Sequence, residues 1–373
     1  MKSNLIISIA IGAIWNFGLA IGNTAGAATI HFDFLAPGYV QEIYTVPIRV
    51  GVGVTSAGMA WSGAGNLMTK NGNQLQEYSP STMVHQGTNV HSVMNTHIVS
   101  GLDPNVNALG ITNAPGGVIY ANTSLGLQRI DPTYTFATTI PGTVGGAYGI
   151  TTLPNGQIAY AGGAGNKIYV YDPVSGSNTL LFTSATTIVF DDIEANLTGQ
   201  IALAGIFEKE LLIIDILGLL LNTISTGLHH HPDGIAFVAG VGTEAIMVNN
   251  NDGSISRYDF SSGYSNAPVA VDIATTNAGR RAYGDLASCG PDGALYVTQY
   301  DMGVRGSDPG FATKWDNGVN NNEASIVRIS SSTPGASLCA AAAFSVPEPS
   351  TLPIAAIGLL SIFAAHRRGR FGR

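Results

Sequence analysis

The stretch Tyr148-Gly149-Ile150-Thr151, followed by the turn Pro154-Asn155-Gly156 and the run Ile168-Tyr169-Val170-Tyr171-Asp172, decides the fold of this chain. The stretch opens with a residue that is followed directly by glycine, here Tyr148-Gly149. A turn of proline, asparagine and glycine comes next, and β-branched and aromatic residues lead to a closing aspartate. The same order of features returns roughly every 40–50 residues, and a fixed period of this length indicates a repeat architecture.

Six copies of this pattern follow one another along the chain. The other five open at Ala57-Gly58, Leu109-Gly110, Asp191-Asp192, Asp233-Gly234 and Tyr283-Gly284. Each copy holds short β-rich runs between turns, and no stretch keeps a helical period. Four-stranded blades around an axis satisfy this pattern because radial closure leaves only short, protected edges. The sequence therefore predicts an all-β fold, a six-bladed β-propeller, with a flat β-solenoid or two β-sandwiches as the alternatives.

The repeats resemble those of NHL-like and SMP-30/gluconolactonase-like propellers over about residues 52–330. We place the propeller domain at residues 29–330 and a Ser/Ala-rich linker at residues 331–345. Within the domain, we expect residues 30–54 to supply an outer strand that completes the last blade.

Two stretches interrupt the period of the repeats. Ser79–Leu109 carries His85, His91 and His97, and Asp301–Glu323 is rich in Gly, Asn and Asp. Long loops on a rigid scaffold often carry binding function, so both stretches are candidate binding loops. The alternative is that they only decorate the surface.

Both ends of the chain have the composition of targeting signals. Residues 1–28 combine Lys2, an apolar run and a small-residue zone that ends at Ala28, which is the order of a secretory signal peptide. At the other end, the apolar run Leu352–Ala365 is followed by a basic stop, which should stay on the cytoplasmic side of a membrane. The basic stop contains Arg367, Arg368 and Arg370.

Residues 346–373 resemble the PEP-CTERM sorting signal of bacterial exported proteins. In that family Pro347, Glu348 and Pro349 form the recognition motif, and an exosortase removes the transmembrane helix in transit. The resemblance implies passage through the inner membrane of a Gram-negative-type bacterium, with the cell surface or the extracellular matrix as destination. A buried C-terminal helix is the alternative, which two prolines directly before the apolar run disfavour.

The composition bounds the class of protein. Only 11% of the residues are charged and 47 of the 373 are glycine, which is typical of a turn-rich exported β protein. The formal net charge of −8 argues against nucleic acid as a partner. In an oxidising compartment Cys289 and Cys339 can form a disulfide that pins the Ser/Ala-rich segment to the domain; a free Cys339 in a flexible linker is the other possibility.

The residue that opens each innermost strand of a propeller points to the mouth of the central channel. Two neighbouring copies, the fourth and the fifth, open with Asp191 and Asp233. Carboxylate and amide oxygens suit a hard divalent cation such as Ca²⁺. Further candidates for the channel mouth are Glu194, His231, Asn249 and Asp285.

The metal site of SMP-30-like propellers is similar, because it places a Glu, an Asn and an Asp at three blade openings. The resemblance implies that Asp233 is the Asp element and that Asp191 stands in place of the Asn. The Glu element has no match, since the first copy opens with Ala57. The alternative role for these acids is to cap turns and strand ends through side-chain hydrogen bonds.

These features favour a non-enzymatic exported propeller of the cell surface or extracellular matrix. It would bind an exopolysaccharide or an envelope protein through its channel face or its two insertions. The second hypothesis is a divalent-metal-dependent hydrolase or lyase of the SMP-30/gluconolactonase type, centred on Asp191 and Asp233. A purely architectural role is the third. The chain has no Gly-x-Ser-x-Gly elbow and no phosphate-binding loop.

Overall fold

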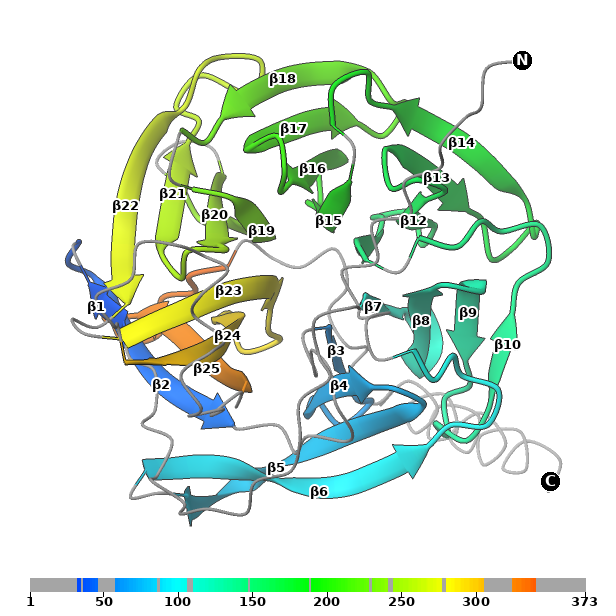
Figure 1. Ribbon diagram of the computed structural model, residues 1–373, viewed down its shortest axis with the longest axis horizontal. Coiled ribbons are helices and arrows are strands. Elements are labelled where there is room, and N and C mark those ends of the chain that lie inside the picture. The colour runs from blue at the N-terminus through cyan, green and yellow to red at the C-terminus, as the bar shows by residue number, and fades with distance from the viewer. Residues whose placement is uncertain are drawn as a thin grey trace, which may run out of the picture.

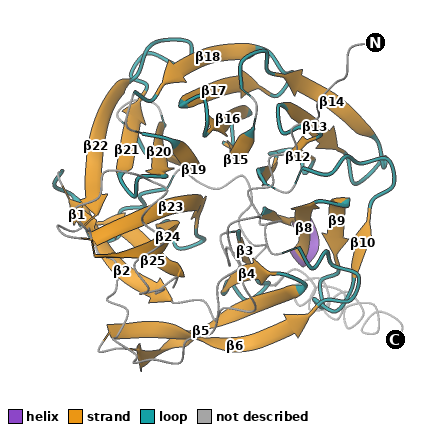
Figure 2. Ribbon diagram, in the orientation of Figure 1, coloured by secondary structure: helices purple, strands orange, loops and turns teal. Residues whose placement is uncertain are grey.

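Six antiparallel sheets stand around a central axis in the computed structural model of the chain (Figure 1). The structure describes residues 32–34, 36–45, 58–85, 88–105, 110–146, 148–187, 189–227, 230–240, 244–276, 280–304 and 324–339. Within these residues the regular structure is almost entirely strand (Figure 2), apart from one 3₁₀ turn at Pro115–Gly117. The predicted six-bladed propeller is confirmed.

The strands follow one another from the innermost to the outer position of each blade. Blade 1 has β3 (Met59–Trp61), β4 (Leu67–Asn71), β5 (Gln74–His85) and β6 (Thr88–Ile98). Blade 2 has β7 (Ile111–Ala114), β8 (Val118–Thr123), β9 (Gly126–Ile130) and β10 (Ala137–Thr139). Blade 3 has β11 (Ile150–Thr152), β12 (Ile158–Gly162), β13 (Lys167–Tyr171) and β14 (Asn178–Thr183).

The remaining blades carry the two N-terminal strands. Blade 4 has β15 (Phe190–Ala195), β16 (Gln200–Gly205), β17 (Glu210–Asp215) and β18 (Leu220–Ser225). Blade 5 has β19 (Pro232–Val238), β20 (Ala245–Asn250), β21 (Ile255–Asp259), β22 (Val269–Thr276) and β1 (Phe32–Phe34). Blade 6 has β23 (Arg280–Cys289), β24 (Leu295–Val304), β25 (Ala324–Ser331) and β2 (Tyr39–Thr45).

The N-terminal strands close the ring. β2 pairs antiparallel with β25, with Ile43 opposite Val327, so the start of the chain supplies the outer strand of the last blade. This confirms the outer strand that residues 30–54 were expected to provide. β1 adds a fifth strand to blade 5 by pairing with β22. Blades 5 and 6 are thus completed by strands that lie far away in the sequence. Loss of the N-terminal strands would expose the outer edges of both blades.

The hydrophobic core lies between the blades rather than in one central mass. Six clusters of buried side chains fill the six gaps between neighbouring blades. The gap between blades 6 and 1 is aromatic: the Trp61 and Tyr296 rings meet edge to face at 4.8 Å, and Tyr44 meets Tyr296 at 5.1 Å. A filled gap at the seam means that the sheet ring is packed all the way round.

The aspartates that close the third and fourth copies, Asp172 and Asp215, have a local structural role. In blade 3 Asp172 Oδ1 accepts a hydrogen bond from the Val174 amide at 2.8 Å. In blade 4 Asp215 Oδ1 accepts from the Leu217 amide at 2.9 Å and from the Leu219 amide at 2.8 Å. These side chains satisfy the amides of the turn between the third and fourth strands. Because this turn needs a side chain that accepts from its amides, an aspartate recurs at this position of the repeat.

The expectation that Ser79–Leu109 forms a loop is wrong, because most of this stretch is strand. β5 and β6 pair from Gln74 opposite Ile98 to His85 opposite Thr88, which makes a long hairpin at the outside of blade 1. The His91 ring stacks on Tyr44 at 4.0 Å, and Thr45 Oγ1 donates to the His91 carbonyl at 2.6 Å. The hairpin therefore reaches across the seam to β2. Of the second insertion, residues 305–323 lie outside the described residues.

The start of the Ser/Ala-rich segment packs on the domain. The Leu338 and Cys339 amides both donate to the Gly293 carbonyl at 2.9 Å, and Cys339 is bonded to Cys289 through a disulfide with a Cα separation of 5.8 Å. Both residues are buried. A linker over the whole of residues 331–345 does not agree with these contacts, so we propose that the folded unit extends to Cys339.

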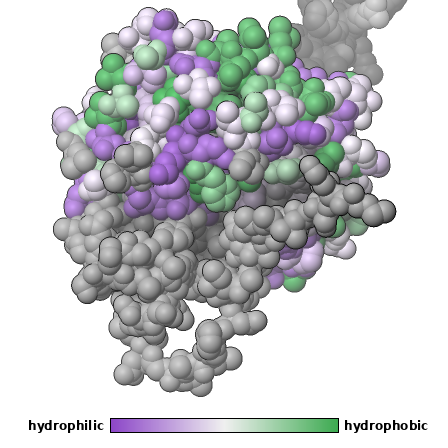
Figure 3. Space-filling model, turned by 45° about the horizontal axis from the view of Figure 1, so that its top comes forward, coloured by the Kyte–Doolittle hydropathy of each residue, from purple (hydrophilic) through white to green (hydrophobic). Residues whose placement is uncertain are grey.

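The two targeting segments, residues 1–28 and 346–373, lie outside the described residues. In the described ranges no helix is long and apolar enough to cross a membrane. On the side of the ring that carries β18, hydrophobic side chains gather among hydrophilic ones (Figure 3). Exposed leucines of this kind include Leu217 and Leu219, in the turn before β18.

Candidate functional site

Three carboxyl groups and one phenol meet where the innermost strands of blades 3 to 6 open. Asp191 lies at the start of β15 and Asp233 at the start of β19. Asp285 lies in β23, and Tyr148 comes just before β11. The carboxyl groups of Asp191 and Asp233 lie close enough to interact directly. Asp233 also interacts electrostatically with Asp285, and Tyr148 does so with all three aspartates. We call Asp191, Asp233, Asp285 and Tyr148 the acid mouth.

Asp233 is the most constrained member of the acid mouth. Its side chain is buried, with 1% of the residue exposed. Asp233 Oδ2 accepts a hydrogen bond from Asn251 Nδ2 at 2.8 Å, whereas the buried Oδ1 receives none. A buried carboxyl oxygen without a donor is unfavourable, because it has lost its water and gained no partner.

Burial and mutual repulsion shift the pKa values of the acid mouth upwards. Removal from water raises the pKa of Asp191. The pKa of Asp233 lies well above its usual range because of burial first, and then because of the negative charges of Asp191 and Asp285. Burial and the same three aspartates raise the pKa of Tyr148 to about 12. Burial therefore favours the protonated form of Asp191 and Asp233, and Tyr148 is a neutral phenol at pH 7.

Close packing of blades 5 and 6 positions the acid mouth. A Cβ on Gly234 would lie 2.4 Å from main-chain atoms of Asp285, Leu286 and Ala287. Only glycine allows this approach. On the next strand, Asn249 Nδ2 donates to the Asp285 carbonyl at 2.6 Å and to the Thr298 carbonyl at 2.9 Å. Asn249, which the sequence placed at the channel mouth, is thus a buried tie between blades 5 and 6.

The central channel narrows to a small cavity of about 70 Å³. Its lining includes Thr151, Asp192 and Glu194. A cavity of this size can hold a few water molecules. Burial raises the pKa of Glu194 to about 8, and its Oε2 lies 3.4 Å from Thr151 Oγ1, so Glu194 is largely a neutral acid at pH 7. Glu194 therefore faces the channel interior, apart from the acid mouth.

Sequence reasoning gave no role to Asp192. Its Oδ1 accepts from the Ile193 amide at 2.9 Å and its Oδ2 from the Ile235 amide at 2.8 Å, so it joins blades 4 and 5. The signal was present, because Asp192 occupies a position that is glycine in the other five copies. His231, expected near the channel, instead contacts the Ile206 carbonyl through Nδ1 at 3.0 Å, in the turn between β16 and β17.

The acid mouth does not fit a divalent metal of the lactonase type. Within the part of the chain that the structure describes, no group of three or more His, Cys, Asp or Glu side chains converges to hold a metal ion. Ca²⁺ takes six to eight oxygen ligands from several groups that converge on one point, and such convergence is not found among these side chains. The position of the missing Glu element, Ala57, lies outside the described residues.

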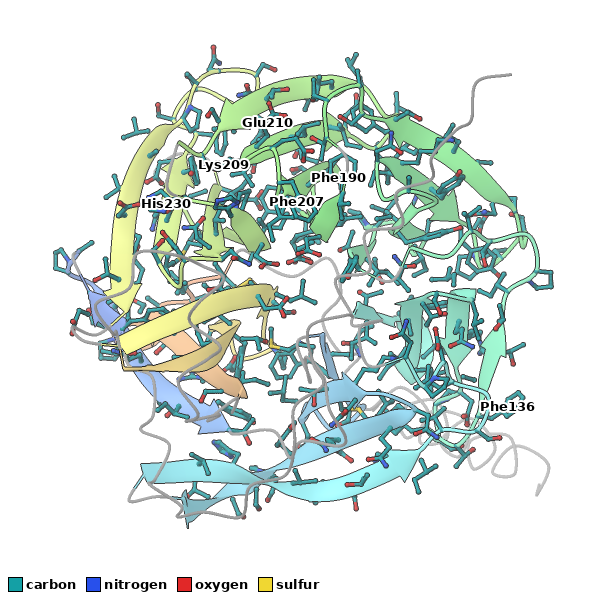
Figure 4. The ribbon with its side chains drawn as sticks, in the orientation of Figure 1. Phe136, Phe190, Phe207, Lys209, Glu210 and His230 are labelled. Atoms are coloured by element: carbon teal, nitrogen blue, oxygen red, sulfur yellow. A yellow bond between two sulfur atoms is a disulfide. The ribbon has the colours of Figure 1, made fainter. Side chains whose placement is uncertain are left out.

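A second group of titratable side chains lies beside β20 and β21, where Figure 4 labels His230. His230 Nδ1 lies 3.1 Å from Asp252 Oδ2 and 3.1 Å from Ser254 Oγ, and its Nε2 lies 3.3 Å from Asp272 Oδ1. The neighbouring Asn251 amide donates to the His231 carbonyl at 2.8 Å. His230 thus fastens the segment before β19 to blade 5. The hydrogen bond to Asp252 is the main cause that raises the pKa of His230.

We expect the His230 contacts to stabilise the protein at low rather than high pH. Because the folded pKa of His230 is raised above its ordinary value, its contribution is complete below about pH 6.5 and is lost as the pH rises through the folded pKa. The melting temperature of the wild type minus that of His230→Gln should therefore fall between about pH 6 and pH 9. A difference that is constant with pH would contradict the expectation.

Comparisons with known proteins agree with the propeller fold and with the sorting motif near the C-terminus. Residues 345–368 match the description of the PEP-CTERM protein-sorting motif. No curated protein matches the chain. Among solved structures, a glucose dehydrogenase-type oxidoreductase from Thermus thermophilus is similar, with a TM-score of 0.52 and 14% identity over 78% of this chain and 100% of that one.

Two further solved structures are similar to the chain. A protein assigned as a gluconolactonase is 13% identical over 81% of this chain and 98% of that one, with a TM-score of 0.47. The calcium-binding protein regucalcin from Agrobacterium tumefaciens is 15% identical over 77% of this chain and 96% of that one, with a TM-score of 0.44. Identities this low show the fold alone. The chain is a six-bladed β-propeller that carries a PEP-CTERM sorting motif, which implies export and processing by an exosortase.

Proposed function

We propose that this chain is a non-enzymatic binding protein of the bacterial cell surface or extracellular matrix, and that it holds an exopolysaccharide at the acid mouth. Residues 1–28 act as its signal peptide. The apolar run Leu352–Ala365 crosses the inner membrane only in transit, until exosortase cleavage near the Pro347-Glu348-Pro349 motif releases the domain. The sorting motif supports the export route.

One observation carries the binding role. Asp233 keeps a buried carboxyl oxygen without a hydrogen-bond donor, in contact with a second carboxyl group. A buried oxygen without a donor lowers stability, whereas both carboxyl oxygens of Asp192 accept main-chain amides and join two blades. Local features that lower stability in an otherwise consistent fold are expected at functional sites. Carboxylate oxygens beside an aromatic ring are also a suitable surface for the hydroxyl groups and ring faces of sugars.

The experiment compares the purified, exported wild-type protein with the double variant Asp191→Asn, Asp233→Asn. Asp172→Asn is the matched control, since Asn also caps turns and Asp172 lies at the outer turn of blade 3. Calorimetry with the polysaccharide of the producing strain should show binding to wild type and control, and an affinity at least about tenfold lower for the double variant. Equal binding by all three would remove the acid mouth from the function.

A divalent-metal-dependent hydrolase or lyase of the gluconolactonase type is the second candidate. It is supported by the contact between the Asp191 and Asp233 carboxyl groups, whose oxygens are of the kind that hard cations prefer. The small number of converging ligands counts against it. Calorimetric titration of calcium chloride into the wild type and Asp233→Asn separates this candidate from the binding role, because calcium binding that is lost in the variant would favour the enzyme.

A further inference from the structure

One rim of the propeller exposes leucine side chains. In blade 4, Leu217 and Leu219 lie in the turn between β17 and β18 and are 84% and 63% exposed. Leu197, in the turn between β15 and β16, and Leu180, on β14 of blade 3, are exposed as well. We call these four leucines the apolar rim. They belong to the side of the ring on which hydrophobic side chains gather in Figure 3.

Packing between neighbouring turns joins the apolar rim into one surface. A Cβ on Gly199 would lie 3.6 Å from Ile216 Cβ, so the turn between β15 and β16 rests on the turn between β17 and β18. A Cβ on Gly218 would lie 2.3 Å from the Leu181 carbonyl oxygen, so this second turn lies against β14 of blade 3. Apolar surface that is both exposed and continuous marks a place of contact with a partner.

Strand direction places the turns of the apolar rim on the face where the domain ends. The acid mouth lies where the innermost strands begin. Because each blade is antiparallel, the turns between its first and second strands and between its third and fourth strands lie on the opposite face. Cys339, the last described residue, bridges Val238 at the end of the innermost strand β19, so it lies on that opposite face too. We call this face the exit face.

The exit face of blades 3 and 4 has little charge. Its turns span residues 153–157, 172–177, 195–200 and 215–219, and the charged residues in them are Asp172 and Asp215. Both carboxylates accept hydrogen bonds from amides of their own turn. A partner of this surface is therefore recognised by apolar contact and not by charge.

The sorting tail brings the exit face close to a membrane. Twelve residues, 340–351, separate Cys339 from the apolar run that starts at Leu352. A chain of this length spans at most roughly 45 Å when it is fully extended. While the apolar run is inserted, the domain thus stays within that distance of the bilayer. A short tether gives even a weak contact a high effective concentration.

We propose that the apolar rim docks on the lipid surface of the inner membrane while the chain is anchored by its tail, an inference that rests on the membrane passage in the proposed function. Leucine side chains on protruding turns enter the boundary between headgroups and acyl chains. The acid mouth, on the opposite face, then points away from the membrane and stays open to polysaccharide. Cleavage by the exosortase removes the tether, so the released domain leaves the lipid.

A second copy of the chain fits the apolar rim less well than a bilayer does. A stable dimer buries roughly 800 Å² on each partner, which four partly exposed leucines do not provide. A lipid surface needs no matching shape, and the tether already holds it in reach.

The test measures contact between the apolar rim and acyl chains. The full chain is reconstituted into vesicles of phosphatidylethanolamine and phosphatidylglycerol, prepared with and without brominated acyl chains, which quench nearby tryptophan. Leu219→Trp places a probe in the rim. Leu125→Trp is the matched control, because Leu125 is 59% exposed in the turn between β8 and β9, on the opposite face. After subtraction of the wild-type signal, quenching should be at least about twofold at position 219 and absent at position 125.

Two further measurements check that apolar contact is the cause. Adding Leu217→Ser to Leu219→Trp should reduce the quenching by at least about half. Serine fits this turn, because Ser261 has the same position after the closing Asp259 of blade 5. Vesicles of phosphatidylcholine alone should give the same quenching, since these turns hold no Lys or Arg for anionic headgroups.

The outcomes separate the docking from the proposed function. Equal quenching at positions 219 and 125, or none at either, would overturn the docking, while polysaccharide binding by the exported protein is decided by its own calorimetry. A full chain that an alkaline wash removes from the vesicles would overturn the membrane passage and the docking together. If the exported wild type sediments as a dimer and the double variant Leu217→Ser, Leu219→Ser as a monomer, the rim binds a second copy and the inference is overturned.

Discussion

Replacing Ile43 with aspartate is expected to lower the free energy of unfolding by about 3 kcal/mol or more. Ile43 lies in β2, the N-terminal strand that completes blade 6, and it is 4% exposed. A carboxyl group at this position is buried without a partner, and it weakens the contact that joins the start of the chain to its last blade. Chemical denaturation followed by tyrosine and tryptophan fluorescence measures the loss.

Val40→Asp is the control for Ile43→Asp because it makes a similar change in the same strand. Val40 pairs with Ser330 in the same ladder but is 47% exposed, so its substitution should change stability by no more than about 0.5 kcal/mol. Equal effects of the two substitutions would mean that β2 does not close the ring as described.

The second large effect is expected from Gly234→Ala, which should destabilise the protein by about 1–3 kcal/mol. The new methyl group would lie 2.4 Å from main-chain atoms of blade 6, so β19 and β23 must move apart. No flexible side chain is available to give way, because the atoms in question are the Asp285 carbonyl oxygen, the Leu286 carbonyl carbon and the Ala287 nitrogen. The same displacement moves Asp285 away from Asp233, so ligand binding should fall with stability.

Gly63→Ala serves as the control for Gly234→Ala. A Cβ on Gly63 meets no atom within 4 Å, so this substitution should be neutral or slightly stabilising because it restricts the unfolded chain. Thermal unfolding of both variants measures the difference. Similar melting temperatures for the two variants would contradict the close contact between blades 5 and 6.

The fold was predictable because each repeat carries its own turn chemistry. The closing aspartates, such as Asp172 and Asp215, cap turns within their own blade, so the pattern is local and visible in the sequence. The β5–β6 hairpin was not predictable in this way. The stretch Ser79–Leu109 interrupts the period of the repeats, which predicted a loop, but pairing over Gln74–Ile98 and contact with β2 keep the segment extended. Tertiary pairing outweighed local preference.

The candidate site was predictable in part. Asp191 and Asp233 open neighbouring copies of the repeat, so closure of the ring brings their side chains together. It also brings Asp285 and Tyr148 close to them. The sequence could not say which polar residues would serve the framework instead. His231 and Asn249 have the composition of ligands, yet their partners are the main-chain carbonyls of Ile206 and Asp285. Such partners depend on loop geometry, which the periodicity of the repeat does not specify.

The central claim is that the Asp191–Asp233 pair is kept for binding and not for stability. The most direct measurement is calorimetric binding of the strain's polysaccharide to Asp191→Asn, Asp233→Asn, recorded with the melting temperature of the same sample. Because burial disfavours the charged form of both carboxyl groups, their replacement removes an unfavourable feature, and the account predicts a melting temperature at or above that of wild type and binding weakened by at least about tenfold. A lower melting temperature with unchanged binding would contradict it, because the pair would then be structural.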